Sequence, residues 1–68
     1  MDWRSKVFIG WKTSSSYWLR WTTECGLYYW LHATENRWIS EPEQINMPPF
    51  PTRAAAEAAL KTAPEPPL

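Results

Sequence analysis

The chain has 68 residues, and its seven basic residues balance its seven acidic ones, so the formal net charge is zero. This length allows one domain that buries only about 60% of its unfolded surface, so the core depends on large side chains, among them six Trp. One Cys and one His exclude an internal disulfide and a zinc site, and balanced charge disfavours a dedicated duplex-DNA-binding protein; we expect no cofactor.

The first forty residues predict an antiparallel sheet. Apolar side chains recur at odd positions, as on a strand with one buried face, and Gly26 and Asn36 suit turns that require a positive φ. Gly10 is expected to mark a bulge or a strand end. Short connections favour an α+β fold with a three- to four-stranded antiparallel meander sheet and one C-terminal helix packed on one face. The predicted strands are 3–11, 17–23, 27–33 and 37–40.

The second part of the chain predicts a linking segment and a helix. All seven prolines follow residue 41, so residues 41–51 are expected to be extended and to be anchored by Ile45, Met47 and Phe50. Thr52 is a natural N-cap for a helix that Pro64 ends. Residues 1–63 then form a single small domain, and residues 64–68 a proline-rich flexible tail. The helix arc expected to pack on the sheet consists of Ala55, Ala56, Ala59, Leu60 and Ala63.

The even-numbered side chains of the sheet form the candidate site. They combine large rings with basic groups and contain no acid in the strand bodies, a composition that is unusual for a solvent-facing surface. Because Trp, Tyr and Arg dominate the energetics of protein interfaces, we expect this face to dock a protein partner. The predicted partner-binding residues are Arg4, Lys6, Phe8, Trp18, Arg20, Tyr28, Trp30, His32 and Trp38.

Other uses of the same face remain open at this point. Bases of single-stranded nucleic acid stack on exposed rings while Arg and Lys hold the backbone. A second copy of the chain could cover the face as a sheet-to-sheet homodimer. The segment Phe50-x-Thr52-x-x-x-Ala56 looks like the start of the helix in plant ethylene-response DNA-binding domains and in phage-integrase arm-binding domains, which lay a three-stranded sheet in a duplex groove.

Residues 18–42 resemble a WW module. Trp18, Gly26, the pair Tyr28-Tyr29, His32, Trp38 and Pro42 carry the resemblance. It implies a proline-peptide groove formed by Tyr28, His32 and Trp38. Two spacings are one residue shorter than in that family, and the usual Leu-Pro before the first Trp is missing.

Catalysis is not expected, because the single His and Cys have no sequence pattern that pairs them as a nucleophile and base. No export signal and no membrane-spanning run is visible, and a lone thiol favours the cytoplasm. The sequence therefore predicts a small non-enzymatic binding protein, of the accessory or inhibitor type that phages and mobile elements encode. It is expected to act in the cytoplasm and to bind no membrane.

Overall fold

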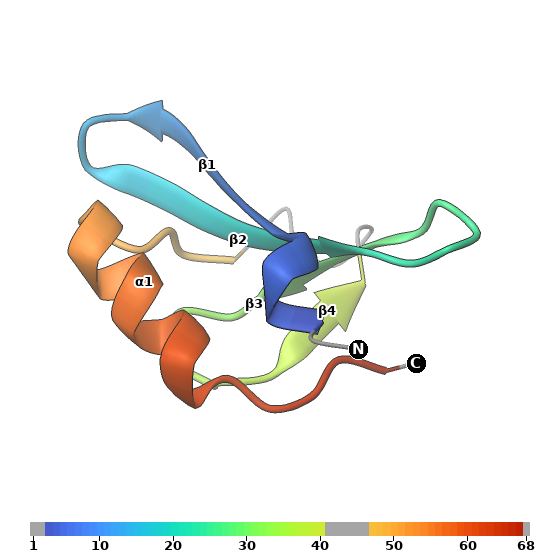
Figure 1. Ribbon diagram of the computed structural model, residues 1–68. Helices are drawn as coiled ribbons and strands as arrows, with labels where there is room; N and C mark the ends of the chain where they lie inside the picture. The colour runs from blue at the N-terminus through green and yellow to red at the C-terminus, as the bar shows by residue number, and fades with distance from the viewer. Residues whose placement is uncertain (1–2, 41–46, 68) are drawn as a thin grey trace.

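The computed structural model describes residues 3–40 and 47–67. A short 3-10 helix, η1 (Trp3–Lys6), precedes the strands, and one α-helix follows them (Figure 1). Each strand pairs antiparallel with the next, in the order β1-β2-β3-β4, which confirms the predicted meander and the α+β class. The strands are β1 (Val7–Thr13), β2 (Ser16–Thr22), β3 (Tyr28–Leu31) and β4 (Trp38–Ser40), and the helix is α1 (Arg53–Thr62).

Two of the three turns follow from the residues that the sequence singled out. Gly26 has φ 90° and Asn36 has φ 51°, so both occupy the left-handed region as predicted. The prediction for Gly10 is wrong. This residue pairs in regular register with Trp18, and the irregularity in β1 lies further on, between Trp11 and Thr13.

The helix packs on the face formed by odd residues of β1, β2 and β3, as predicted. Leu19, Leu31 and Ala56 are completely buried there, and Phe50 and Ala63 are nearly so. Small side chains on α1 let the helix approach the large side chains of the sheet closely. We call this side of the sheet the helix face, and the opposite side, which carries Phe8, Gly10, Trp18, Arg20, Tyr28 and Trp30, the open face.

The segment before α1 extends the sheet where β3 stops. Phe50 and Tyr17 exchange both backbone hydrogen bonds, at 2.9 and 2.8 Å, beyond the stretch of β2 that pairs with β3. The predicted anchoring by Met47 and Phe50 is confirmed by their burial, whereas Ile45 lies outside the described residues. Pro66 in the predicted tail is also buried, so this residue lies against the domain.

Replacing Thr52 with alanine is expected to lower the free energy of unfolding by about 1 kcal/mol. The Thr52 hydroxyl accepts a hydrogen bond from the Ala55 N–H at 3.0 Å, and this donor would lose its partner. Chemical denaturation measures the change. The matched control is Thr62→Ala in the last turn, which should change the midpoint little; equal losses in both variants would contradict the capping role.

Candidate functional site

Five of the nine predicted site residues meet on the open face. Phe8 of β1 lies opposite Arg20 of β2, and Arg20 lies opposite Trp30 of β3. Trp18 and Tyr28 precede Arg20 and Trp30 by two residues on the same strands and therefore point the same way. The antiparallel register thus brings four rings and one guanidinium together from three strands: Phe8, Trp18, Arg20, Tyr28 and Trp30.

Arg20 is the centre of this cluster. Its guanidinium carbon lies 4.6 Å from the ring centroid of Tyr28, 5.1 Å from that of Phe8 and 5.8 Å from that of Trp30. Each distance is within the range of an attractive cation–π interaction. Trp18 meets Trp30 edge to face, with centroids 6.5 Å apart, so the rings also support one another. These contacts with rings from three strands hold the side chain of Arg20 in place.

Two polar atoms of the cluster have unmet hydrogen-bonding capacity. Nε of Arg20 and Nε1 of Trp30 are buried and have no hydrogen-bond partner in the part of the chain that the structure describes. Buried donors in folded proteins nearly always have an acceptor, and one left without a partner raises the free energy of the fold. The rest of the guanidinium fork is suited to carboxylate, phosphate or carbonyl oxygens.

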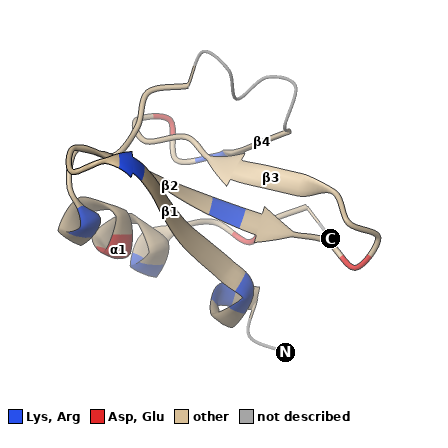
Figure 2. Ribbon diagram, turned by 90° about the horizontal axis from the view of Figure 1, so that it is seen from above, with Lys and Arg blue, Asp and Glu red and all other residues tan. Residues whose placement is uncertain are grey.

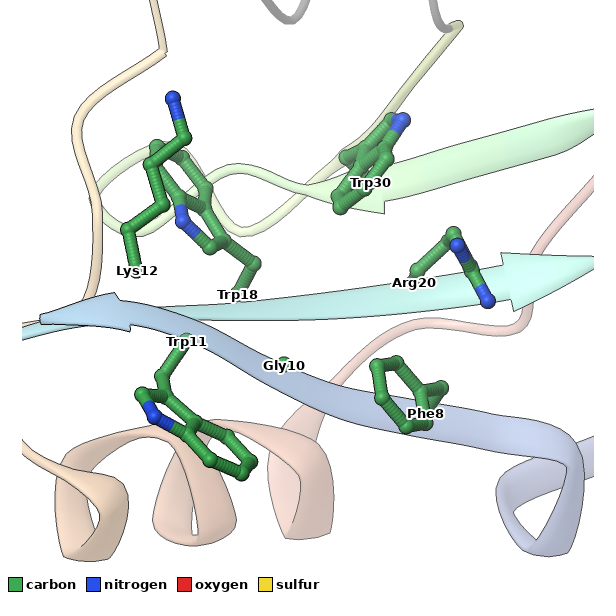
Figure 3. A pocket seen from close by; sticks show the side chains of 7 residues that line it. All are labelled: Phe8, Gly10, Trp11, Lys12, Trp18, Arg20 and Trp30. Atoms are coloured by element: carbon green, nitrogen blue, oxygen red, sulfur yellow. The ribbon is translucent and has the colours of Figure 1, made fainter.

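A shallow pocket of about 370 Å³ opens beside the cluster (Figure 3). Gly10 lies between Phe8 and Lys12 in its wall and leaves room for the Phe8 ring: a Cβ on Gly10 would lie 2.9 Å from Cε2 of that ring. Gly10 thus allows the Phe8 ring to lie close to the backbone. The pocket is lined by Phe8, Gly10, Trp11, Lys12, Trp18, Arg20 and Trp30.

The pocket is cationic. Lys12 and Arg20 contribute positive charge, and none of the four strands contains Asp or Glu. Figure 2 shows the same separation: acidic residues of the described chain lie in turns, in α1 and in the C-terminal segment, and the strands carry only basic ones. The face also exposes apolar surface, because Phe8 is 54% and Tyr28 37% accessible.

Arg4 and Lys6 do not lie on the open face, so their predicted placement is wrong. Residues 3–6 form η1 and not the start of a strand, so the side-chain alternation begins only at Val7. The guanidinium of Arg4 donates to the carbonyls of Leu60 (3.2 Å), Lys61 (3.5 Å) and Ala63 (3.4 Å). It therefore caps the C-terminal end of α1, where the helix dipole favours a cation.

Substitution of Arg4 with methionine should destabilise the fold by about 1 kcal/mol, because the last carbonyls of α1 lose their charged donor. Thermal unfolding followed by circular dichroism measures this loss. Lys6→Met in the same 3-10 helix is the control and should have a smaller effect, since no hydrogen bond of Lys6 occurs among the described residues. Equal melting temperatures for Arg4→Met and wild type would exclude the capping role.

Trp38 also lies on the opposite side of the sheet from its predicted place. Leu31 pairs with Trp38 and Trp30 with Ile39. The residues on the helix face are therefore odd-numbered in β3 and even-numbered in β4. Trp38 meets Trp3 edge to face at 5.9 Å, and its Nε1–H donates to the Pro64 carbonyl at 2.8 Å. The Tyr28, His32 and Trp38 groove that the WW resemblance implies is therefore not assembled.

His32 is used inside the turn between β3 and β4. Its Nδ1 accepts hydrogen bonds from the backbone N–H groups of Thr34 (3.2 Å) and Glu35 (3.0 Å). A hydrogen bond from Arg37 and the nearby His32 lower the pKa of the Glu35 carboxyl below its usual value. His32 is thus a structural residue of the turn, and the structure does not bring it to the Arg20 cluster.

The pocket also contains residues outside the predicted set. Lys12 and Trp11 both line it (Figure 3), and Trp11, an odd residue at the sheet edge, is 63% accessible. Lys12 has the same even parity as Phe8 on β1, and this parity predicts that it lies on the open face. Trp11 could not be found by parity, since odd residues were expected to pack beneath the helix.

A second hollow, of about 710 Å³, lies near the end of β2 and contains the exposed thiol of Cys25. His32 is not among its lining residues, so this hollow does not join the thiol to an imidazole base. No group of three or more metal-ligating side chains occurs within residues 3–40 and 47–67. In these same ranges no helix has the length and apolar character needed to cross a membrane.

Comparisons with protein-family models, with curated proteins and with solved structures gave no match to this chain.

Proposed function

We propose that this chain is a small non-enzymatic binding protein that docks a protein partner through the open face. The observation that carries the proposal is the Arg20 cluster, in which three rings hold one cation in place. Preorganised Arg, Trp and Tyr side chains lose little conformational entropy when a partner covers them, and they are the residues that dominate protein interfaces.

Single-stranded nucleic acid is the second candidate, favoured by the exposed rings of Phe8 and Trp11 beside Lys12. Two observations favour a protein partner over nucleic acid. The rings that surround Arg20 already contact the guanidinium or each other with a face or an edge, so less of their surface is open for base stacking. The open face offers Arg20 and Lys12 as cations, whereas a nucleic-acid site needs several to hold successive phosphates.

The proposal includes an accessory or inhibitory role, because a rigid face of this kind can cover a site on its partner. It also includes the cytoplasm as the place of action. Cys25 is the single cysteine of the chain and is exposed, and an unpaired exposed thiol persists best in a reducing compartment.

Affinity capture from nuclease-treated host lysate tests the proposal. Wild type, the open-face double variant Trp18→Ala/Tyr28→Ala and the helix-surface control Glu57→Ala serve as baits. We expect wild type and Glu57→Ala to retain the same protein and the double variant to lose it while keeping its fold by circular dichroism. Equal capture by all three baits would refute the proposal. Binding that disappears on nuclease treatment would assign the face to nucleic acid, and a doubled mass of the bait alone, lost in the double variant, to a homodimer.

A further inference from the structure

The free edge of β1 presents a defined set of backbone groups. Both hydrogen bonds of Tyr17 go to Phe50, so its N–H and C=O point away from β1. Directions alternate along a strand, so Trp18 points towards β1 and pairs there with Gly10 in regular register. It follows that the N–H and C=O groups of Ile9 and Trp11 point outward from the sheet. None of the hydrogen bonds found among the described residues involves these groups.

This edge differs from the other edge of the sheet. β1 has seven residues and β4 three, so β1 offers the longer ladder. Proteins usually protect such edges with charges, prolines or bulges, but from Val7 to Trp11 the edge carries none of these. The charged residue of β1, Lys12, and the irregular pairing between Trp11 and Thr13 lie at the end of the strand.

Large exposed rings flank the same edge on both sides. Phe8 and Trp11 differ in parity, so they project from opposite sides of β1, and both are more than half accessible. A partner lying flat on the open face would cover Phe8 but only the part of Trp11 that borders the pocket. An added strand would cover both rings, because its own side chains alternate between the two sides.

The charge beside the edge identifies the chemistry of such a strand. A side chain of an added strand opposite Gly10 would lie against the Phe8 ring, which covers the glycine, and beside the pocket that Lys12 and Arg20 line. Both are cations, and no acid lines the pocket. A second copy of β1 would bring another lysine and no acid, so charge complementarity favours a different, acidic strand.

We propose that the β1 edge takes an extended segment of a protein partner as a fifth strand, with acidic side chains on the side of the open face and apolar side chains beside Ile9 and Trp11. This inference rests on the proposed function, since it names the chemistry of the partner. The main-chain hydrogen bonds of Ile9 and Trp11 would supply affinity, and Lys12 with Arg20 would select acidic residues.

Nuclear magnetic resonance on the full-length labelled chain tests the inference. The probe is an acetylated peptide of alternating residues, Glu-Val-Glu-Val-Glu-Val-Glu, and its matched control has Lys in place of every Glu. We expect the acidic peptide to slow hydrogen exchange of the Ile9 and Trp11 amides at least tenfold and to bind at least tenfold more tightly than the Lys peptide. Protection of the Leu19 and Leu31 amides monitors the fold throughout.

The other outcomes separate the two proposals. Shifts of the Trp18 and Trp30 indoles without protection of Ile9 and Trp11 would overturn strand addition and leave docking on the open face intact. Equal binding of the Lys peptide would overturn the acidic partner. No response to either peptide, with strong indole shifts on adding octathymidylate, would overturn both proposals. A doubled mass of the free protein with the Ile9 and Trp11 amides already protected would assign the edge to a second copy.

A backbone change provides the decisive variant. The chain is short enough for chemical synthesis, and N-methylation of Ile9 removes one outward donor while keeping the side chain and the ladder to β2. This variant should bind the acidic peptide at least tenfold more weakly than wild type. Lys12→Gln should weaken binding as well and remove part of its salt dependence. Unchanged affinity in the N-methylated protein, with Leu19 and Leu31 still protected, would overturn strand addition.

Discussion

Replacing Leu19 with alanine is expected to lower the free energy of unfolding by about 3 kcal/mol. Leu19 is completely buried and packs in the core that joins β2 to Leu31, Phe50 and Ala56. The loss combines the burial of the missing methyl groups with the cavity that they leave. A domain of this size has a total stability of only about 3–10 kcal/mol, so this loss removes about a third of it or more.

Urea denaturation followed by Trp fluorescence measures this effect. Leu27→Ala is the matched control: the same change is made at a residue that is 58% exposed, and it should shift the midpoint little. A Leu19→Ala protein with the wild-type midpoint, or a Leu27→Ala protein as unstable as Leu19→Ala, would show that the core is not where the structure places it.

Arg20→Met is expected to separate binding from stability. Partner affinity should fall by about 30- to 100-fold, since an arginine at the centre of an interface commonly contributes about 2 kcal/mol or more. The free energy of unfolding should stay within about 1 kcal/mol of wild type. Methionine retains the contact with the rings of Tyr28 and Phe8 and loses the cation–π attraction, but it also removes the buried Nε that has no partner.

Isothermal titration with the captured partner and chemical denaturation together measure the two quantities. Arg53→Met provides the control, because Arg53 is exposed on α1 and its one ion pair within residues 3–40 and 47–67 is with Glu57 in the next turn. It should change neither binding nor stability appreciably. Unfolding of Arg20→Met would make Arg20 a structural residue, and full binding by a folded Arg20→Met protein would remove it from the site.

Alternation and helix periodicity predicted the parts of the fold that depend on local pattern. Four strands, the turns at Gly26 and Asn36, the Thr52 cap and the alanine-rich buried arc of α1 all agree with the structure. Each depends on the conformational preference or hydrophobic pattern of a few neighbouring residues. The same alternation placed Phe8, Trp18, Arg20, Tyr28 and Trp30 on one face because β1, β2 and β3 share their parity.

The wrong predictions concern residues whose position depends on the exact length of a turn or on contacts between distant parts of the chain. The turn from His32 to Arg37 sets the register of β4, and one residue more or less in such a turn reverses every side chain that follows it. Trp38 was therefore placed on the wrong face. Arg4 was misplaced because its partners, the carbonyls that end α1, lie more than fifty positions away in the chain. The free edge of β1 could not be identified until the strand order was known.

Photo-crosslinking from a single position tests the central claim, that a protein docks on the open face, most directly. Tyr28 lies beside Arg20 and is partly exposed, so replacing it with p-benzoylphenylalanine places the reactive group at the cluster. The same replacement of Ala58, which is exposed on α1, serves as the control. We predict that position 28 crosslinks to one protein in cell lysate and position 58 does not. Crosslinking of that protein from position 58 and not from position 28 would contradict the account.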